Sequence, residues 1–183
     1  MAVMTACAAA VLLTFSAVSG IQDAPRAGTL GYTAPTTWRT RPASSSMRVA
    51  EFVIPRSPGD AEDAELVVYY FGTGAGTIDA NVNRWLGQIH ADGSSTSGDA
   101  RRSTRTVNGL QVTLVDAAGT YVAEVRPGAT EHYNKPGFRL RAAVVETPHG
   151  PYYIKMTGPA KTMGAADDDF AAFLGSLRYT PNE

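Results

Sequence analysis

The stretch YYFGTGAGTIDANVNRW, residues 69–85, decides how this chain folds and whether it resembles a nucleotide-binding enzyme. An apolar, β-rich run ends in it, glycines follow at alternate positions, and an amphipathic pattern begins. A dinucleotide fingerprint needs G-x-G-x-x-G within a parallel strand–helix–strand unit. Here Thr77 stands where the third glycine is required, and no Gly-Lys-Ser/Thr of a P-loop follows. We therefore predict a turn between a strand and a helix, without a nucleotide phosphate site.

The helix after this turn has the clearest periodicity in the chain. Its apolar residues recur at helical spacing and form one stripe: Ile78, Val82, Trp85, Leu86 and Ile89. Thr77 is a suitable N-cap for this helix, because its side-chain oxygen can accept from a free first-turn amide. Free amides at a helix start can also hold a small anion. Gly74, Gly76 and Thr77 are therefore candidate anion contacts.

Strand patterns lie on both sides of this helix in the sequence. The run AELVVYYF (64–71) is apolar on both faces and predicts a central strand, preceded by a strand in SMRVAEFVI (46–54). Asn108 and Gly109 supply the two positive-φ residues of a type I′ turn and predict a hairpin around them. FRLRAAVVE (138–146) and PYYIKMT (151–157) flank a second predicted turn.

The closing segment DDDFAAFLGSL (167–177) predicts a second helix. Its three aspartates stand at the amino end, where the helix dipole favours negative charge. Strands, a helix, about four antiparallel strands and a helix follow one another along the chain. This order predicts the α+β class, with a single antiparallel β-sheet and two main helices packed on it.

The amino-terminal residues predict export. Residues 1–19 carry no charged side chain, and their apolar run is shorter than the roughly 20 residues plus anchors that span a bilayer. Small residues precede a cleavage position before Gly20, as in a secretory signal peptide. Residues 20–36 predict a flexible linker, and one globular domain is expected over 37–179. We expect a periplasmic or extracellular protein with no integral membrane span in the mature chain.

The single cysteine and the overall charge exclude several classes of protein. Cys7 precedes the apolar run instead of following it, which disfavours a lipid anchor, and removal of 1–19 leaves no thiol. The formal net charge of −1 disfavours a nucleic-acid partner, which would require a basic face. We expect a monomer.

No motif specifies a reaction or a cofactor. His90, His132 and His149 form no helical i,i+4 pair, and neither G-x-S-x-G nor S-x-x-K occurs. The adjacent aspartates at 167–169 suit a helix start better than a calcium loop. We therefore predict no catalytic residue, no metal and no cofactor. An extracytoplasmic hydrolase with a dispersed active site is the alternative, because triads and carboxylate pairs come from distant residues.

Two segments predict a contact surface. EHYNKPGF contains Tyr133 and Lys135, and GPYYIKMTGP contains Tyr153 and Lys155. In the second segment, strand alternation directs Tyr152 to the core and the next residue, Tyr153, outward together with Lys155. Tyrosine and lysine side chains at loops or strand edges can form a surface for a protein partner.

Several segments together resemble a family of uncharacterised exported bacterial proteins. They are SSSMRVAEFVIP, ELVVYYFGTGAG, NVNRWLGQ, GTYV, AAVVETPHGPYYIKMTGP and the closing FLGSL, and they cover most of Trp38–Leu177. That family carries no assigned activity. The order of elements also resembles the PsbP-like and DcrB-like α/β/α sandwiches, which act mostly as accessory or binding proteins. The resemblance implies an exported, non-catalytic domain that binds a protein or a cell-envelope component, although fold alone does not fix function.

Overall fold

The computed structural model describes residues 28–91 and 100–181, so the predicted signal peptide, Cys7 and the first part of the predicted linker lie outside the described residues. In chain order the elements are β1 (Gly28–Gly31), β2 (Arg39–Arg41), β3 (Arg48–Ile54), β4 (Ala64–Tyr70), the 3-10 turn η1 (Gly72–Gly74), α1 (Ile78–Leu86), β5 (Ile89–His90), β6 (Arg101–Val107), β7 (Leu110–Tyr121), β8 (Lys135–Val145), β9 (Tyr152–Pro159), α2 (Ala160–Ala165), α3 (Asp167–Gly175) and β10 (Arg178–Pro181).

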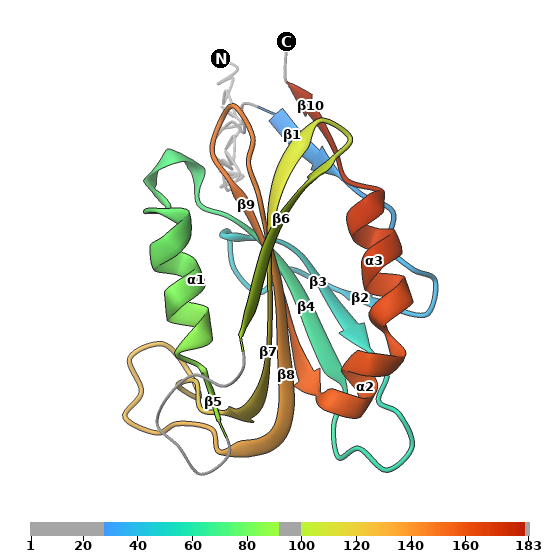
Figure 1. Cartoon of the computed structure of the whole chain (residues 1–183), viewed down its shortest axis with the longest axis vertical. Helices are drawn as coiled ribbons and strands as arrows, with labels where there is room; N and C mark the ends of the chain where they lie inside the picture. The colour runs from blue at the N-terminus through green and yellow to red at the C-terminus, as the bar shows by residue number, and fades with distance from the viewer. Residues whose placement is uncertain (1–27, 92–99, 182–183) are drawn as a thin grey trace, which may run out of the picture.

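An eight-stranded sheet forms the centre of the domain, in the order β2-β3-β4-β9-β8-β7-β5, with β6 also paired to β7. Every strand pairing among the described residues is antiparallel. Figure 1 shows α1 on one face of this sheet and α2 and α3 on the other. The α+β prediction is therefore confirmed, and α1 does not belong to the parallel unit that a dinucleotide site requires.

Each face of the sheet has its own hydrophobic core. The core beneath α2 and α3 contains Phe52, Tyr152 and Phe173, and the core beneath α1 contains Trp85 and Tyr153. The expectation that Tyr153 faces outward is wrong, because its side chain is 0% exposed. Strand alternation correctly places Tyr152 and Tyr153 on opposite faces of the sheet. Helices cover both faces, so both side chains are buried.

The glycine-rich stretch is a turn that leads into α1, as predicted. Gly72 and Gly76 have positive φ values of 64° and 74°, a conformation that costs glycine little. Thr77 is the N-cap of α1, and its hydroxyl oxygen accepts a hydrogen bond from the Ala80 amide at 3.1 Å. The buried amide of Asn81 donates to the Ala75 carbonyl at 2.7 Å and fixes the turn against the helix.

Both predicted hairpins are present. Asn108 and Gly109 have φ values of 47° and 83° and join β6 to β7, with Val107 opposite Leu110. The second hairpin joins β8 to β9, with Val145 opposite Tyr152.

The predicted linker and the predicted single sheet require correction. Residues 20–27 lie outside the described residues, but Gly28–Gly31 form β1, which pairs with β10 in a separate two-stranded sheet. Leu30 is 3% exposed within the core beneath α3. The glycines and threonines of this segment resemble a linker in composition, yet backbone pairing and the buried leucine order it. The domain therefore includes Gly28 and extends through Pro181 rather than ending at 179.

Candidate functional site

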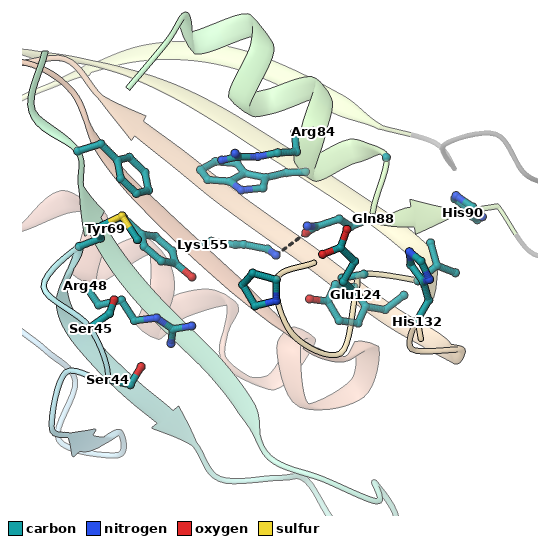
Figure 2. A pocket seen from close by; sticks show the side chains of 18 residues that line it. Ser44, Ser45, Arg48, Tyr69, Arg84, Gln88, His90, Glu124, His132 and Lys155 are labelled. Atoms are coloured by element: carbon teal, nitrogen blue, oxygen red, sulfur yellow. Dashed lines mark hydrogen bonds between the residues drawn. The ribbon is translucent and has the colours of Figure 1, made fainter. Parts of the chain in front are cut away.

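A pocket of about 990 Å³ opens on the α1 face of the sheet. Its walls come from the segment before β3, the end of β4, the carboxyl end of α1, the end of β7 and the loop after β7. Figure 2 shows these side chains around Lys155 of β9. Its lining residues include Arg48, Tyr69, Arg84, Trp85, Tyr121 and Lys155.

Lys155 extends from the floor of the pocket. The antiparallel register places it between Val67 of β4 and Ala142 of β8, two small apolar residues of the same sheet face. The long side chain therefore crosses an apolar surface before its amine reaches polar groups. At its end, Nζ donates a hydrogen bond to Oε1 of Gln88, just beyond α1 (Figure 2).

Aromatic rings line the floor and one wall of the pocket. The rings of Tyr69 and Phe71 are stacked with centroids 5.7 Å apart, and Phe71 contacts Tyr153 at 5.5 Å. Trp85 of α1 meets Tyr153 edge-on at 5.8 Å. Tyr121 stands on the other side, where its ring centroid lies 5.4 Å from the Lys155 amine. A flat or apolar part of a ligand can pack against such rings.

Three cationic side chains line this aromatic pocket. Arg48 lies 5.5 Å from the Tyr69 ring centroid and forms an ion pair with Glu51 at 3.1 Å. Arg84 donates to Oδ1 of Asn81 at 2.8 Å. Within residues 28–91 and 100–181, neither Arg84 nor Lys155 forms an ion pair with a carboxylate.

The pocket is positively charged as a result. Glu124 is the one carboxylate among its described lining residues, and its Oε2 accepts from the Gly128 amide at 2.7 Å. Burial lowers the pKa of Lys155 to about 8; Glu65 opposes this change, and Arg84 and Arg48 add to it. Burial likewise raises the pKa of Tyr121 to about 12, so this phenol stays neutral at physiological pH.

Of the four predicted contact residues, Lys155 alone lines the pocket. Tyr153 lies beneath the pocket as part of the buried core. Tyr133 and Lys135 come together beside it: the Lys135 amine lies 4.6 Å from the Tyr133 ring centroid and pairs with Glu62 at 2.6 Å. Tyr133 also stacks on Tyr121, a pocket residue, at 5.8 Å.

The three candidate anion contacts lie apart from the pocket. Gly74, Gly76 and Thr77 are exposed at the amino end of α1, and none of them lines the pocket. The Thr77 hydroxyl already caps the helix through Ala80. Anion binding at this turn stays a prediction.

Arg84, Gln88 and Arg48 were missed as site residues. Helical periodicity places Arg84 and Gln88 away from the apolar stripe, which is the ordinary pattern of a solvated face. Arg48 follows a serine-rich segment whose position is set by pairing of distant strands. The one available signal was Lys155, a lone lysine within an apolar strand.

Groups capable of hydrolysis are present but unconnected. Ser44, Ser45, His90 and His132 all line the pocket. The hydrogen bonds among the described residues include none between a serine hydroxyl and a histidine, and His132 Nδ1 instead contacts the Thr130 carbonyl at 3.0 Å.

In the described part of the chain, no group of three or more His, Cys, Asp or Glu side chains could hold a metal ion. None of the described helices is long and apolar enough to cross a membrane.

Comparison with known proteins shows similarity of fold. No protein-family model and no curated protein sequence matches the chain. The crystal structure of LpqN, a protein involved in cell envelope biogenesis of Mycobacterium tuberculosis, is 14% identical with a TM-score of 0.53, over 87% of this chain and 88% of that one.

Two further solved structures are similar. One is a protein of unknown function from Pseudomonas aeruginosa described as a putative regulator, 15% identical with a TM-score of 0.48, over 88% of this chain and 90% of that one. The other is the cyanobacterial PsbP of Synechocystis sp. PCC 6803, 10% identical with a TM-score of 0.48, over 89% of this chain and 99% of that one. A PsbP is thus among the similar structures, as the order of elements led us to expect.

Proposed function

We propose that this protein is an exported, non-catalytic binding domain whose pocket holds a small anionic ligand of the cell envelope. The observation that carries the proposal is the pair Arg84 and Lys155, two cations without a carboxylate partner among the described residues, beside aromatic rings. An anion placed between them would restore charge balance, and charge-assisted hydrogen bonds are the stronger kind.

The shape of the pocket supports a ligand with an apolar part. Its volume of about 990 Å³ is at the upper end of the range for small-molecule sites. Tyr69, Trp85 and Tyr121 offer ring surface, and Met47, 54% exposed, adds a flexible apolar side chain at the rim. Such a site suits an amphipathic molecule with one acidic group.

The cellular setting rests on two supports. Residues 1–19 have the pattern of a signal peptide, and a structure of the same fold belongs to a protein involved in cell envelope biogenesis. A component of the envelope is therefore the ligand source that we favour.

The hydrolase alternative has less support from the geometry. A glycosidase needs two facing carboxylates, whereas Glu124 is the one acid among the described lining residues. Ser44 and Ser45 form no described hydrogen bond with His90 or His132. The same residues fit a polar rim that orients a ligand.

Binding of 8-anilinonaphthalene-1-sulfonate, an anionic aromatic probe, tests the proposal. We expect saturable fluorescence enhancement with the wild-type protein, and about tenfold weaker binding with Arg84→Gln, a loss of about 1.4 kcal/mol. Arg178→Gln is the matched control, because Arg178 lies on β10, away from the pocket. This variant should bind the probe as tightly as the wild-type protein does.

Displacement then defines the ligand class. Decanoate should displace the probe at lower concentration than decanol, because only decanoate carries the acidic group that Arg84 and Lys155 would bind. Absence of saturable binding, or equal affinity of Arg84→Gln and wild type, would contradict the proposed pocket function.

A further inference from the structure

The three lysines of the chain differ sharply in their surroundings. Lys135 forms an ion pair with Glu62 at 2.6 Å, and the exposed Lys161 donates to the Pro58 carbonyl at 2.6 Å. Lys155 faces the pocket, and its amine is bonded to the neutral side chain of Gln88. A carboxylate in direct contact would hold the proton on the amine, and none of the described carboxylates forms an ion pair with Lys155.

The groups around the Lys155 amine favour its uncharged form. The apolar sheet beneath it removes water, and Arg84 and Arg48 repel a second positive charge, while Glu65 acts in the opposite direction. The neighbouring Tyr121 remains protonated. Near pH 8 about half of the amine is therefore neutral, and the neutral amine is the nucleophilic form.

We propose that the Lys155 amine forms a reversible imine with a small carbonyl compound that also carries an anionic group. The nitrogen lone pair attacks the carbonyl carbon, and a C–N bond forms. Proton transfer from nitrogen to oxygen and loss of that oxygen as water leave a C=N bond. Amine plus carbonyl gives imine plus water, so no oxidant or reductant takes part.

The pocket supports each part of such a ligand. Lys155 Nζ is directed into the open volume from the pocket floor, with Gln88 as its hydrogen-bond partner (Figure 2). Arg84 has no ion-pair partner in the described part of the chain and is available for the anionic group. The rings of Trp85 and Tyr121 flank the space for an aromatic or apolar body. The anionic part of this inference rests on the proposed function, whereas the reactivity of the amine does not.

Reductive trapping on the wild-type chain tests the proposal. The protein is incubated with pyridoxal 5′-phosphate, which carries an aldehyde, an aromatic ring and a phosphate, and is then reduced with sodium borohydride. Peptide mass spectrometry compares labelling at the three lysines within the same molecule. We expect Lys155 to be labelled at least tenfold faster than Lys135 or Lys161. Equal labelling, or preferential labelling of the exposed Lys161, would overturn the proposal.

Variants separate the amine from the anion site. Lys155→Arg should lose the label at 155 while Lys161 is labelled as before. Arg84→Gln should slow pyridoxal phosphate labelling of Lys155 about tenfold, because it removes the contact for the phosphate. Its labelling by uncharged benzaldehyde should slow much less, because that reaction is affected only through the higher pKa of the amine. Should the anilinonaphthalene probe bind as proposed while Lys155 shows no selectivity, the imine proposal fails and the pocket function stands. If benzaldehyde labels Lys155 selectively but the anilinonaphthalene probe does not bind, the reactivity of the amine stands and the proposed pocket function fails.

Discussion

Arg139 of β8 binds both carboxylate oxygens of Asp116 on the neighbouring strand β7, with Nε–Oδ1 at 2.8 Å and Nη2–Oδ2 at 2.6 Å. Nη1 of Arg139 also contacts Oδ1 of Asp167, the first residue of α3, at 3.0 Å. Arg141 donates to the same Asp167 oxygen at 2.5 Å, and its guanidinium lies 4.5 Å from the Phe170 ring centroid. The two arginines therefore attach the start of α3 to the sheet.

This ion-pair cluster predicts a loss of stability in acid. Burial acts to raise the pKa of Asp116, but the hydrogen bonds and charge of Arg139 outweigh it, so the pKa is lowered. A lowered carboxyl pKa contributes stability above the unfolded value of about 4, and the contribution disappears as the pH falls through the folded pKa. Asp116→Asn should lower the unfolding free energy at pH 7 by about 1–3 kcal/mol and weaken its dependence on acid pH. Urea unfolding between pH 2 and 7 measures both.

Asp168→Asn is the control for this prediction. Asp168 is exposed in the first turn of the same helix. Its substitution should lower the unfolding free energy by only about 0.3–1 kcal/mol, through the lost interaction with the helix dipole. Equal losses in the two variants would show that the contact with Arg139 does not matter.

Asn81 is predicted to be a stabilising residue of α1, although it lies opposite the apolar stripe. It is 5% exposed, and its amide donates to the carbonyls of Ala75 and Thr77 at 2.7 and 3.0 Å. Asn81→Ala leaves these carbonyls without that donor and should cost about 1–3 kcal/mol of unfolding free energy. Asn83→Ala, on the exposed side of the same helix, should be neutral or slightly stabilising because alanine favours helix. Thermal and urea melts that rank the two variants equally would refute the role of Asn81.

Asn108 is predicted to serve both the β6–β7 hairpin and the end of α3. Its φ is 47°, and its side-chain amide donates to the carbonyls of Gly175 and Leu177 at 3.0 and 2.9 Å. Asn108→Gly keeps the backbone conformation and loses these two bonds, at about 1–2 kcal/mol. Asn108→Ala adds a backbone penalty of about 1 kcal/mol. Unfolding free energies should therefore fall in the order wild type, glycine variant, alanine variant, and an alanine variant as stable as the glycine variant would contradict the strained turn.

A truncation tests the corrected domain boundary. A chain of residues 28–183 should unfold like the longer chain without 1–19, whereas 37–183 should lose about 3 kcal/mol or more. The reason is the burial of Leu30 together with the ring of Tyr32, which lies 5.1 Å from that of Phe173. Differential scanning calorimetry of the two truncated chains measures the difference. If 37–183 were as stable as 28–183, β1 would contribute nothing to the core.

Local signals in the sequence predicted most of the fold. The Asn108-Gly109 turn, the stripe of α1 and the aspartates of α3 each depend on residues close together in the chain, so they could be recognised without coordinates. β1 could not, because its partner β10 lies at the other end of the domain. α2 was also missed, because it is only six residues long and contains Gly164.

The candidate site was predictable only in part. Strand alternation separates Tyr153 and Lys155 from the other sheet face, but it does not show that α1 covers Tyr153. Arg84 and Gln88 look solvated in the sequence because the strands that complete the pocket around them come from distant segments. The pocket depends on tertiary packing. Its positive charge can be recognised only from the structure, which shows which cations have an ion-pair partner.

Nuclear magnetic resonance of the ¹⁵N-labelled protein during titration with decanoate tests the central claim most directly. We expect saturable shifts of amide signals that surround the pocket, notably those of Gly87, Gln88, Tyr121 and Lys155, with much smaller shifts in Arg84→Gln. Absence of shifts, or shifts confined to the turn at Gly74–Thr77, would contradict a ligand site beneath α1.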